Sequence, residues 1–220
     1  REAQDEYAFT SLTRAQEAAK AGRFADEIAP VTYTTRKGEV TIDADEQPPK
    51  AKPEKIPTLR PAFAKDGTVT AAHSASISDG AAALVMMRAS EAEKRGLKPL
   101  AKIVGQSTHA QEPCWFTTAP IDSIKKVLAK AGWAKDDVDL WEINEAFAVV
   151  AMAAIRDLEL DHGKVNVHGG ACALGHPIGA TGARLLVTLI HALKTHGGKK
   201  GVASLCIGGG EATAVAIELV

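Results

Sequence analysis

The spacing of hydrophobic residues changes along the chain from a helical to a strand-like period. Apolar side chains recur at near-helical intervals over residues 2–20, which predicts an opening helix. Short apolar and β-branched runs at 28–31 and 40–42 predict two strands joined by a turn. Prolines between residues 48 and 57 then predict an extended segment, which separates two regions of the chain.

The second region alternates between predicted strands and helices. Thr68-Val69-Thr70 predicts a strand entering a loop of small residues at 71–78, and an apolar run follows at 81–87. From residue 100 the predicted order is strand 100–104, helix 121–131, strand 138–143, helix 146–158, glycine-rich loop 169–182, helix 183–193, strand 201–206 and strand 212–219. This alternation is typical of α/β proteins, in which buried strands carry helices on both faces.

Composition excludes several classes of partner. The 220 residues include 26 basic and 27 acidic side chains, and the net charge of -1 gives no general attraction to nucleic acid or anionic membranes. No uncharged apolar run reaches the roughly 18 residues that a membrane-spanning helix needs. We therefore expect no nucleic-acid partner and no membrane partner.

The three cysteines and seven histidines show no metal-binding spacing along the chain. No CxxC or HExxH pattern occurs, so no metal site is expected. An odd number of cysteines argues against a disulfide framework and favours a reducing, cytoplasmic compartment. An organellar matrix stays open, because the sequence does not begin with Met and could have lost a targeting segment.

Three candidate sites lie where predicted strands end, which is the usual location of active sites in α/β sheets. The first is Asn144-Glu145-Ala146-Phe147, directly after strand 138–143. Asn144 can cap the following helix, with Glu145 favourable at the positive end of that helix, or it can bind water or substrate. The residues alone leave both interpretations open.

The second candidate is His176, which lies in a segment with five glycines between residues 169 and 182. Its place near the start of a helix predicts a neutral imidazole that can accept a proton, because the positive helix end disfavours imidazolium. A structural histidine and a phosphate-binding role for the glycines are the alternatives. Neither GxxxxGK[ST] nor GxGxxG is present, which argues against the common nucleotide-binding loops.

The third candidate is Cys206, which ends predicted strand 201–206 and precedes three glycines at 208–210. Free cysteines are most often inert core residues, and this is the favoured interpretation of Cys114 and Cys172. Consecutive glycines leave their N–H groups open to hold an oxyanion beside a thiol. Cys206 is therefore the cysteine expected to take part in chemistry.

Taken together, these segments resemble the C-terminal signatures of thiolases. The likeness is carried by Asn144-Glu145-Ala146-Phe147, by GGACALGHPIGATGAR from Gly169 to Arg184, and by Cys206 to Gly210. Their order and spacing match, and the likeness continues through TVTAAHSASISDGAAAL from Thr68. The resemblance implies a layered αβαβα fold, of which this chain supplies the second half and part of a loop domain.

Thiolases consist of two similar α/β halves with an inserted loop domain, so the resemblance implies three pieces here. Residues 1–62 correspond to the end of the loop domain, 63–98 to the last piece of the N-terminal core half, and 99–220 to the C-terminal core domain. The family's acylated cysteine belongs to the N-terminal half, and no motif here matches its surroundings. That half is expected as a partner, and a homo-oligomer, either a dimer or a tetramer, is expected as well.

The reaction implied by the resemblance is a reversible Claisen condensation of two acyl-CoA molecules to a 3-ketoacyl-CoA. Coenzyme A and its thioesters are substrates, and no cofactor is implied. His176 would activate the acylated cysteine, and Cys206 would remove the α-proton of the second acyl-CoA, with a thiol pKa tuned towards working pH. Asn144 would hold a water that forms one oxyanion hole with His176, and Gly208 N–H would contribute to the second.

The resemblance also implies contacts with the substrate. The residues expected against the pantetheine are Ala71, Ala75, Ile77, Ala146 and Phe147. Lys55 is a candidate partner of a CoA phosphate, although a solvated loop face explains such a lysine equally well. Phe116 resembles the residue that limits room for the acyl chain, which favours acetyl or acetoacetyl groups.

Three positions depart from the family pattern. A typical member has Asn and Ser where this chain has His73 and Ala75, and often has Asn where it has His168. The first two changes remove polar groups expected to contact the pantetheine. A longer-chain 3-ketoacyl-CoA thiolase and a non-catalytic thiolase-like subunit are the alternatives. Ketoacyl synthases use a His/His pair and fit less well, because Cys206 occupies one of those positions.

Overall fold

The computed structural model describes residues 1–220 and is built around one mixed sheet. Its strands are β3 (Ala101–Ala110), β4 (Leu140–Ile143), β5 (Lys200–Ile207) and β6 (Glu211–Leu219). They lie side by side in the order β3-β6-β5-β4, with β4 and β5 parallel and β6 antiparallel to both of its neighbours. Every strand expected after residue 100 is present, although β3 continues beyond the predicted end at 104.

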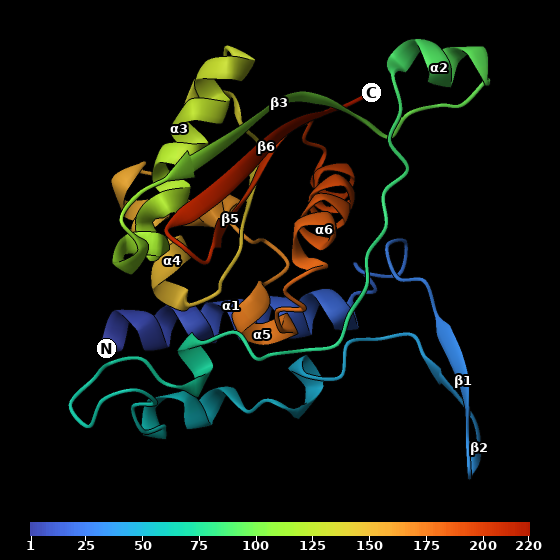
Figure 1. Ribbon diagram of the computed structural model, residues 1–220. Helices are drawn as coiled ribbons and strands as arrows, with labels where there is room; N and C mark the ends of the chain where they lie inside the picture. The colour runs from blue at the N-terminus through green and yellow to red at the C-terminus, as the bar shows by residue number, and fades with distance from the viewer.

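Helices cover both faces of this sheet, as the alternating pattern predicted (Figure 1). One face carries α3 (Ala119–Ala131) and α4 (Ala148–Asp157), and the other carries α6 (Thr181–His196). Val202 belongs to the core cluster under α3 and α4, whereas its neighbour Ala203 belongs to the cluster under α6. Successive strand residues point to opposite faces, so β5 supplies both cores.

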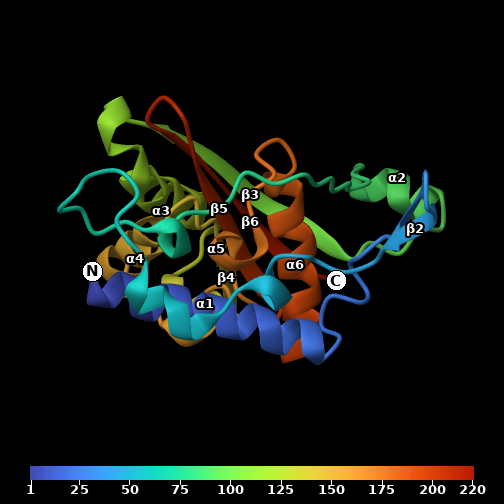
Figure 2. The ribbon, with the colours of Figure 1, turned by 90° about the horizontal axis from the view of Figure 1, so that it is seen from below.

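The opening helix α1 (Glu2–Lys20) has the predicted bounds and runs below α4 and α6, with the segment around residues 48–58 on its other side (Figure 1, and from below in Figure 2). The short helix α5 (Ala171–Leu174) interrupts the predicted glycine-rich loop. Leu12 and Ala15 of α1 pack with Ala173 of α5 in a third core cluster. The glycine-rich segment is therefore held against α1 rather than standing free as a loop.

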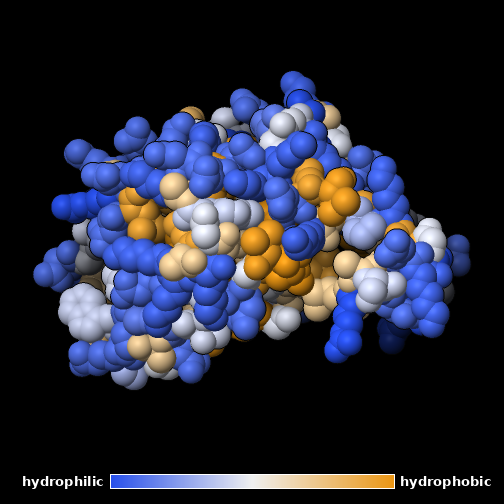
Figure 3. Space-filling view, turned by 90° about the horizontal axis from the view of Figure 1, so that it is seen from above, coloured by the Kyte–Doolittle hydropathy of each residue, from blue (hydrophilic) through white to orange (hydrophobic).

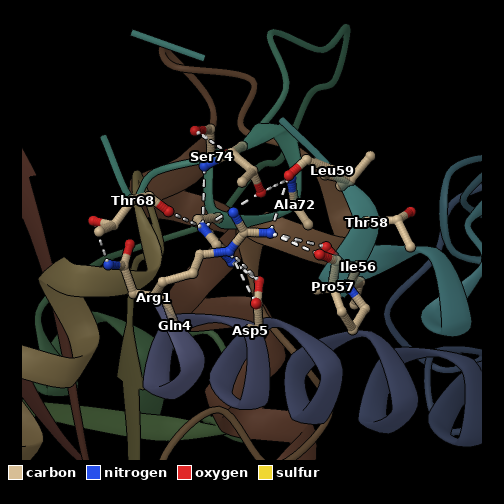
Figure 4. Close-up of polar contacts among 12 residues, drawn as sticks. Arg1, Gln4, Asp5, Ile56, Pro57, Thr58, Leu59, Thr68, Ala72 and Ser74 are labelled. Carbon is tan, nitrogen blue, oxygen red and sulfur yellow. Dashed lines mark hydrogen bonds and ion pairs between the residues drawn. The ribbon is translucent and has the colours of Figure 1, made fainter. Parts of the chain in front are cut away.

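Polar contacts tie the start of α1 to the segment that leads towards residue 74 (Figure 4). Arg1 forms an ion pair with Asp5 at 2.9 Å, and its Nη2 donates to the carbonyl of Leu59 at 3.0 Å. Gln4 Nε2 donates to Thr68 Oγ1 at 2.9 Å. These contacts fix the path of the chain into the loop of small residues.

The proline-rich segment is not simply extended, and that prediction was wrong. It forms the 3₁₀ helices Pro48–Lys50 and Pro53–Thr58, each of which starts at a proline. Proline suits a first helical position, because its φ is already set and the missing N–H has no helical partner to lose. Further 3₁₀ helices are Ala71–His73, Pro113–Thr118, Lys135–Asp137 and His162–Lys164.

The predicted pair of short strands is present as the hairpin β1 (Val31–Thr35) and β2 (Gly38–Ile42). The first strand lies three residues later than predicted. The strand predicted at Thr68-Val69-Thr70 is absent, and Thr70 forms only an isolated bridge with Pro61. The chain beside this run offers only Pro61, which has no N–H, and Ala62, whose N–H donates to the Val69 carbonyl at 2.8 Å, so the pairing does not extend into a strand ladder.

The apolar run at 81–87 has neither helix nor strand, and the short helix α2 (Ala89–Lys94) follows it. Its side chains are open to solvent, with Val85 91% and Met86 67% exposed. Figure 3 shows apolar patches among charged residues on the face seen from above. None of the helices combines the length and apolar character required to cross a membrane.

Candidate active site

Parallel pairing of β4 with β5 brings two of the candidate segments to one edge of the sheet. Ile143 is paired with Ser204, and Asn144 N–H donates to the Ser204 carbonyl at 2.9 Å. Asn144 therefore lies beside the last residues of β5, where Cys206 is located. The carboxyl ends of these two strands form the floor of the site.

The loop of small residues joins the first candidate segment to the second. Ala75 N–H donates to the Ala146 carbonyl at 3.1 Å, and His176 N–H donates to the Ser76 carbonyl at 3.0 Å. Residues 75–77 thus form a bridge between the segment after β4 and the segment before α6. Backbone hydrogen bonds rather than side chains hold these parts together, so the arrangement tolerates the alanine at position 75.

Asn144 faces His176 and does not cap a helix. Helix α4 begins only at Ala148, with Phe147 at the cap position, so the capping interpretation of Asn144 was wrong. Asn144 Nδ2 lies 3.5 Å from His176 Nε2, and the asparagine side chain is 1% exposed. Its Oδ1 is buried without a protein hydrogen-bond partner, which leaves an acceptor available to a water or a substrate.

The imidazole of His176 is oriented by a residue that sequence reasoning missed. Thr181, the first residue of α6, places Oγ1 2.7 Å from His176 Nδ1 and donates its own hydrogen to the Pro177 carbonyl at 3.0 Å. A hydroxyl has only one hydrogen, so Thr181 accepts from Nδ1–H. This leaves a lone pair on Nε2, the nitrogen that faces Asn144.

The pKa of His176 lies below its ordinary value, as the expectation of a neutral imidazole required. Burial is the main cause, and the positive charge of Arg184 on the first turn of α6 is the second. The sequence argument had named the helix dipole instead. A neutral imidazole with a free Nε2 can accept a proton at neutral pH.

Cys206 is buried, and burial raises the pKa of its thiol to about 11. The expectation of a thiol pKa tuned towards working pH is therefore wrong for this environment. At neutral pH the group is a thiol, which can donate a proton but must lose one before acting as a base. Next to it, Gly208 is exposed and its N–H donates to no protein acceptor, as predicted for an open oxyanion donor.

The carboxylate of Glu145 is the centre of a buried network that sequence reasoning also missed. Tyr7 Oη donates to it at 2.9 Å, Ser11 Oγ at 2.8 Å and Asn166 Nδ2 at 2.9 Å. Backbone N–H of Cys172 supplies a fourth hydrogen bond at 3.0 Å. Glu145 thus ties the segment that carries Asn144 to α1 and α5, and it does not stabilise the start of α4.

Arg184 meets the buried carboxyl group of Glu142. Arg184 Nη1 lies 3.5 Å from Glu142 Oε2, and Glu142 is 1% exposed. Burial raises the pKa of Glu142 to about 8, although Arg184 opposes the shift. Glu142 and Asn144 are two residues apart and so point to the same face of the sheet. The contact between Arg184 and Glu142 therefore links the strand that carries Asn144 to the helix that orients His176.

His73, one of the departures from the family pattern, lies under the loop rather than on its surface. Its side chain is fully buried, with Nδ1 accepting from Thr70 N–H at 3.0 Å and Nε2 2.8 Å from Asp5 Oδ1. It therefore positions the loop against α1. A direct contact of His73 with a substrate on the solvent side is excluded by this burial.

The residues expected to contact the substrate are only partly gathered. Phe147 packs edge-on against Phe116, with ring centroids 6.5 Å apart, and against Phe63 at 5.9 Å. Ile77 pairs with His176 and is 93% exposed, while Ala71 is exposed and Ala75 is half-buried. Lys55 is exposed on the 3₁₀ helix Pro53–Thr58 and takes part in none of these contacts.

The other two cysteines have different surroundings. Cys172 is in α5, and burial followed by the charge of Glu145 raises the pKa of its thiol well above the ordinary value. Cys114 is exposed on the 3₁₀ helix Pro113–Thr118. The raised pKa of Cys172 keeps it as a thiol at neutral pH, so it lacks the features of an activated nucleophile.

Sequence comparison gives matches over nearly the whole chain. Residues 97–219 match the profile described as "Thiolase, C-terminal domain", and residues 1–90 match "Thiolase, N-terminal domain". The acetyl-CoA acetyltransferase of Yarrowia lipolytica is 52% identical over 220 residues, which are 100% of this chain and 55% of that protein. The cytosolic acetyl-CoA acetyltransferase of Mus musculus is 51% identical over 221 residues, covering 99% of this chain and 56% of the relative.

Solved structures agree with the sequence matches. The acetyl-CoA acetyltransferase of Bacillus anthracis superimposes with a TM-score of 0.95 at 47% identity, over 99% of this chain and 55% of that chain. A thiolase from Ascaris suum in complex with coenzyme A gives 0.89 at 41% identity, over 100% and 56%. The chain thus spans about 55% of the length of the relatives that it matches. On its sequence, its fold and its paired strand-end motifs, the chain belongs to the thiolase family.

Proposed function

We propose that this chain forms the acid/base part of an acyl-CoA C-acyltransferase site that makes or cleaves acetoacetyl-CoA or another short 3-ketoacyl-CoA. The observation that carries the proposal is the oriented imidazole of His176, whose free Nε2 faces Asn144 at 3.5 Å beside the end of β5. Relatives named acetyl-CoA acetyltransferase, about half identical to this chain, support the choice of acyl group. The packing of Phe116 against Phe147 is consistent with a small acyl group.

His176 performs the first proton transfer of the proposed reaction. Its Nε2 takes the proton of a cysteine thiol, and the resulting thiolate attacks the acyl carbonyl of a CoA thioester and displaces CoA as its thiolate. Once protonated, Nε2–H becomes a hydrogen-bond donor while Nδ1–H stays on Thr181. The same imidazole can then stabilise an oxyanion together with a water held by Asn144 Oδ1.

Cys206 performs the second transfer. It first gives its thiol proton to the departing CoA thiolate and then, as a thiolate, removes the α-proton of the second acyl-CoA. The carbanion attacks the acyl carbon of the acylated cysteine, the carbon–carbon bond forms as the carbon–sulfur bond breaks, and the released cysteine thiolate takes its proton back from His176. In the cleavage direction the same thiol returns a proton to the departing carbanion. Its raised pKa suits the cleavage step directly, because a thiol is the donor required there. The open N–H of Gly208 is the donor proposed for the acyl-enzyme oxyanion.

The acylated cysteine is proposed to lie outside these 220 residues, in an N-terminal half of the same enzyme. Burial raises the thiol pKa of both Cys172 and Cys206, and no motif around Cys114 matches the surroundings of the family's acylated cysteine. Coenzyme A thioesters are the proposed substrates, no resident cofactor is required, and assembly as a homo-oligomer in the cytosol is part of the proposal. The Ascaris suum relative in complex with coenzyme A supports the choice of CoA as ligand.

Thiolysis of acetoacetyl-CoA tests this proposal. The chain alone should give no turnover, and the chain joined to an N-terminal half from a close relative should give turnover that requires both His176 and Cys206. C206A should lower kcat by about 10²–10⁴-fold, the range for a positioned general acid or base. C114S is the matched control and should retain activity. Turnover by the isolated chain, or full activity of C206A, would overturn the proposal.

Comparison of acyl chains separates the main alternative. If acetoacetyl-CoA is the preferred substrate, kcat/KM should fall as the acyl chain lengthens, and F116A should reduce that fall. A human mitochondrial 3-ketoacyl-CoA thiolase shares the fold at a TM-score of 0.89 and 39% identity. The alternative to exclude is therefore a thiolase that prefers longer acyl chains. A higher kcat/KM on long chains in the unchanged enzyme would favour that reading.

A further inference from the structure

Two histidines outside the candidate active site meet through their Nε2 atoms. His168 precedes the glycine pair at 169–170, and His196 is the last residue of α6. The Nε2 atoms are 3.3 Å apart, and the ring centroids are 5.3 Å apart with the planes tilted by 40°. They are 28 residues apart, so their meeting is a property of the fold that chain spacing could not reveal.

The separation of the two nitrogens matches that of two ligands on one tetrahedral ion. Imidazole nitrogens bind zinc at about 2.0–2.1 Å, and two such bonds at the tetrahedral angle place the nitrogens about 3.3–3.4 Å apart. The observed distance is 3.3 Å. A hydrogen bond between the rings also fits this distance, but it requires one Nε2 to carry hydrogen and the other to accept it.

The surroundings hold one ring and leave the other accessible. His168 is 4% exposed and packs edge-on against Phe24, with centroids 5.9 Å apart. His196 is exposed at the end of its helix, so an ion and its water ligands can enter from solvent. One ligand is therefore preorganised, and the second needs little rearrangement.

Charge also bears on cation binding. The carbonyl end of α6 at His196 carries partial negative charge, which favours a cation there. Arg23 is a positive neighbour of His168 and opposes the binding of a metal ion.

We propose that His168 and His196 form a two-histidine binding site for a divalent transition-metal ion such as Zn²⁺ or Ni²⁺. No group of three or more metal-ligating side chains is present, so water completes the coordination. The site is separate from the proposed chemistry, which needs no metal. A bound ion joins the end of α6 to the segment that leads into α5, and so stabilises the fold on which His176 rests.

Calorimetric titration of the chain with Ni²⁺ and with Zn²⁺, in a non-chelating buffer, tests the proposal. C114S serves as the background, because it removes the exposed thiol that could bind the same ions. One ion per chain should bind, and H168Q and H196Q should each weaken binding at least tenfold. H109Q and H191Q are matched controls from elsewhere in the fold and should bind as the background does.

Imidazole ¹⁵N spectra distinguish binding from a structural hydrogen bond. Zn²⁺ should move the Nε2 resonances of His168 and His196 together, and it should raise the melting temperature of the C114S background but not of H196Q. If millimolar Zn²⁺ leaves both resonances unchanged, or if H168Q and H196Q bind as tightly as H109Q, the pair is only a hydrogen bond. A variant that fails to fold is identified by its spectrum, and the other histidine then provides the test.

Discussion

His176 is held by Thr181, whose Oγ1 lies 2.7 Å from Nδ1 while its hydrogen is donated to the Pro177 carbonyl. This relationship determines which imidazole nitrogen can act as a base. Thr181 does not touch the reacting atoms in the proposed reaction and is a positioning residue.

Replacing Thr181 by Val removes the acceptor for Nδ1–H while keeping the shape of the side chain. In the complete enzyme, kcat/KM should fall about tenfold, because one net hydrogen bond of about 1.4 kcal/mol corresponds to that factor. T181S keeps the hydroxyl and should restore activity. In the chain itself, ¹⁵N spectra should show a tautomer mixture in T181V and one tautomer in T181S. One unchanged tautomer in all three proteins would contradict the assignment.

Arg184 is the second residue that acts on His176, through the pKa of its imidazole. Its positive charge is one of the two causes that lower the pKa of His176, so R184M should raise that pKa and R184K should not. Since the neutral form is the base, the acidic limb of kcat/KM should move to higher pH in R184M. An NMR titration of His176 in the chain measures the shift directly. E142Q replaces the carboxyl group beside Arg184 but keeps the arginine charge, and the same shift in E142Q would point to a structural cause.

Local periodicity was sufficient for the elements that bury one clear face. The opening helix and the helices and strands after residue 100 follow their apolar spacing, because tertiary packing and local pattern agree there. Thr68-Val69-Thr70 has the pattern of a strand, but its pairing stops at an isolated bridge with Pro61, so local preference could not decide its structure. The predicted ends of helices and strands differ from the observed ends where a turn, rather than hydrophobic periodicity, sets the boundary.

The chemical motifs were readable because their residues are close together along the chain, whereas their supporting contacts are not. Tyr7 and Glu145 are 138 residues apart. The hydrophobic periodicity of α1 does not identify the group that accepts a hydrogen bond from the tyrosine hydroxyl. The Asn144 to His176 contact was expected only through the family resemblance. Thr181 stood within the quoted motif, yet its role required the direction of its hydroxyl.

Glu142 makes the stability of the chain depend on pH. Its pKa rises from 4.5 to about 8 on folding, so the folded state retains a proton that the unfolded state has lost. The contribution is complete below about pH 4.5 and is lost as pH rises through about 8. The free energy of unfolding should therefore fall less steeply in E142Q than in the parent between about pH 5 and pH 9. Urea unfolding across this pH range measures the free energy of unfolding of both proteins. If the two free energies fall equally with pH, Glu142 does not have the raised pKa.

Glu145 should be among the residues least tolerant of change. E145Q turns one oxygen into a donor, which then faces either the donors of Tyr7 and Asn166 or those of Ser11 and Cys172. The loss in free energy of unfolding should be about 3 kcal/mol, the scale of a broken buried charge network. E46Q, at an exposed position, should change it by less than about 0.5 kcal/mol. Urea unfolding checks both, and equal effects would show that the network contributes little.

The three thiols should differ in reactivity in an order set by access and pKa. Cys114 is exposed and should react first with iodoacetamide at neutral pH. Cys206 is buried with a pKa raised to about 11, so its thiolate is scarce at neutral pH and its alkylation should accelerate with each rise in pH towards that value. Cys172 is held by Glu145 and should react only after unfolding. Peptide mass mapping after timed alkylation gives the order. Fast labelling of Cys206 at neutral pH would mean that its thiol is already activated in this chain, and substrate binding would then not be needed to lower its pKa.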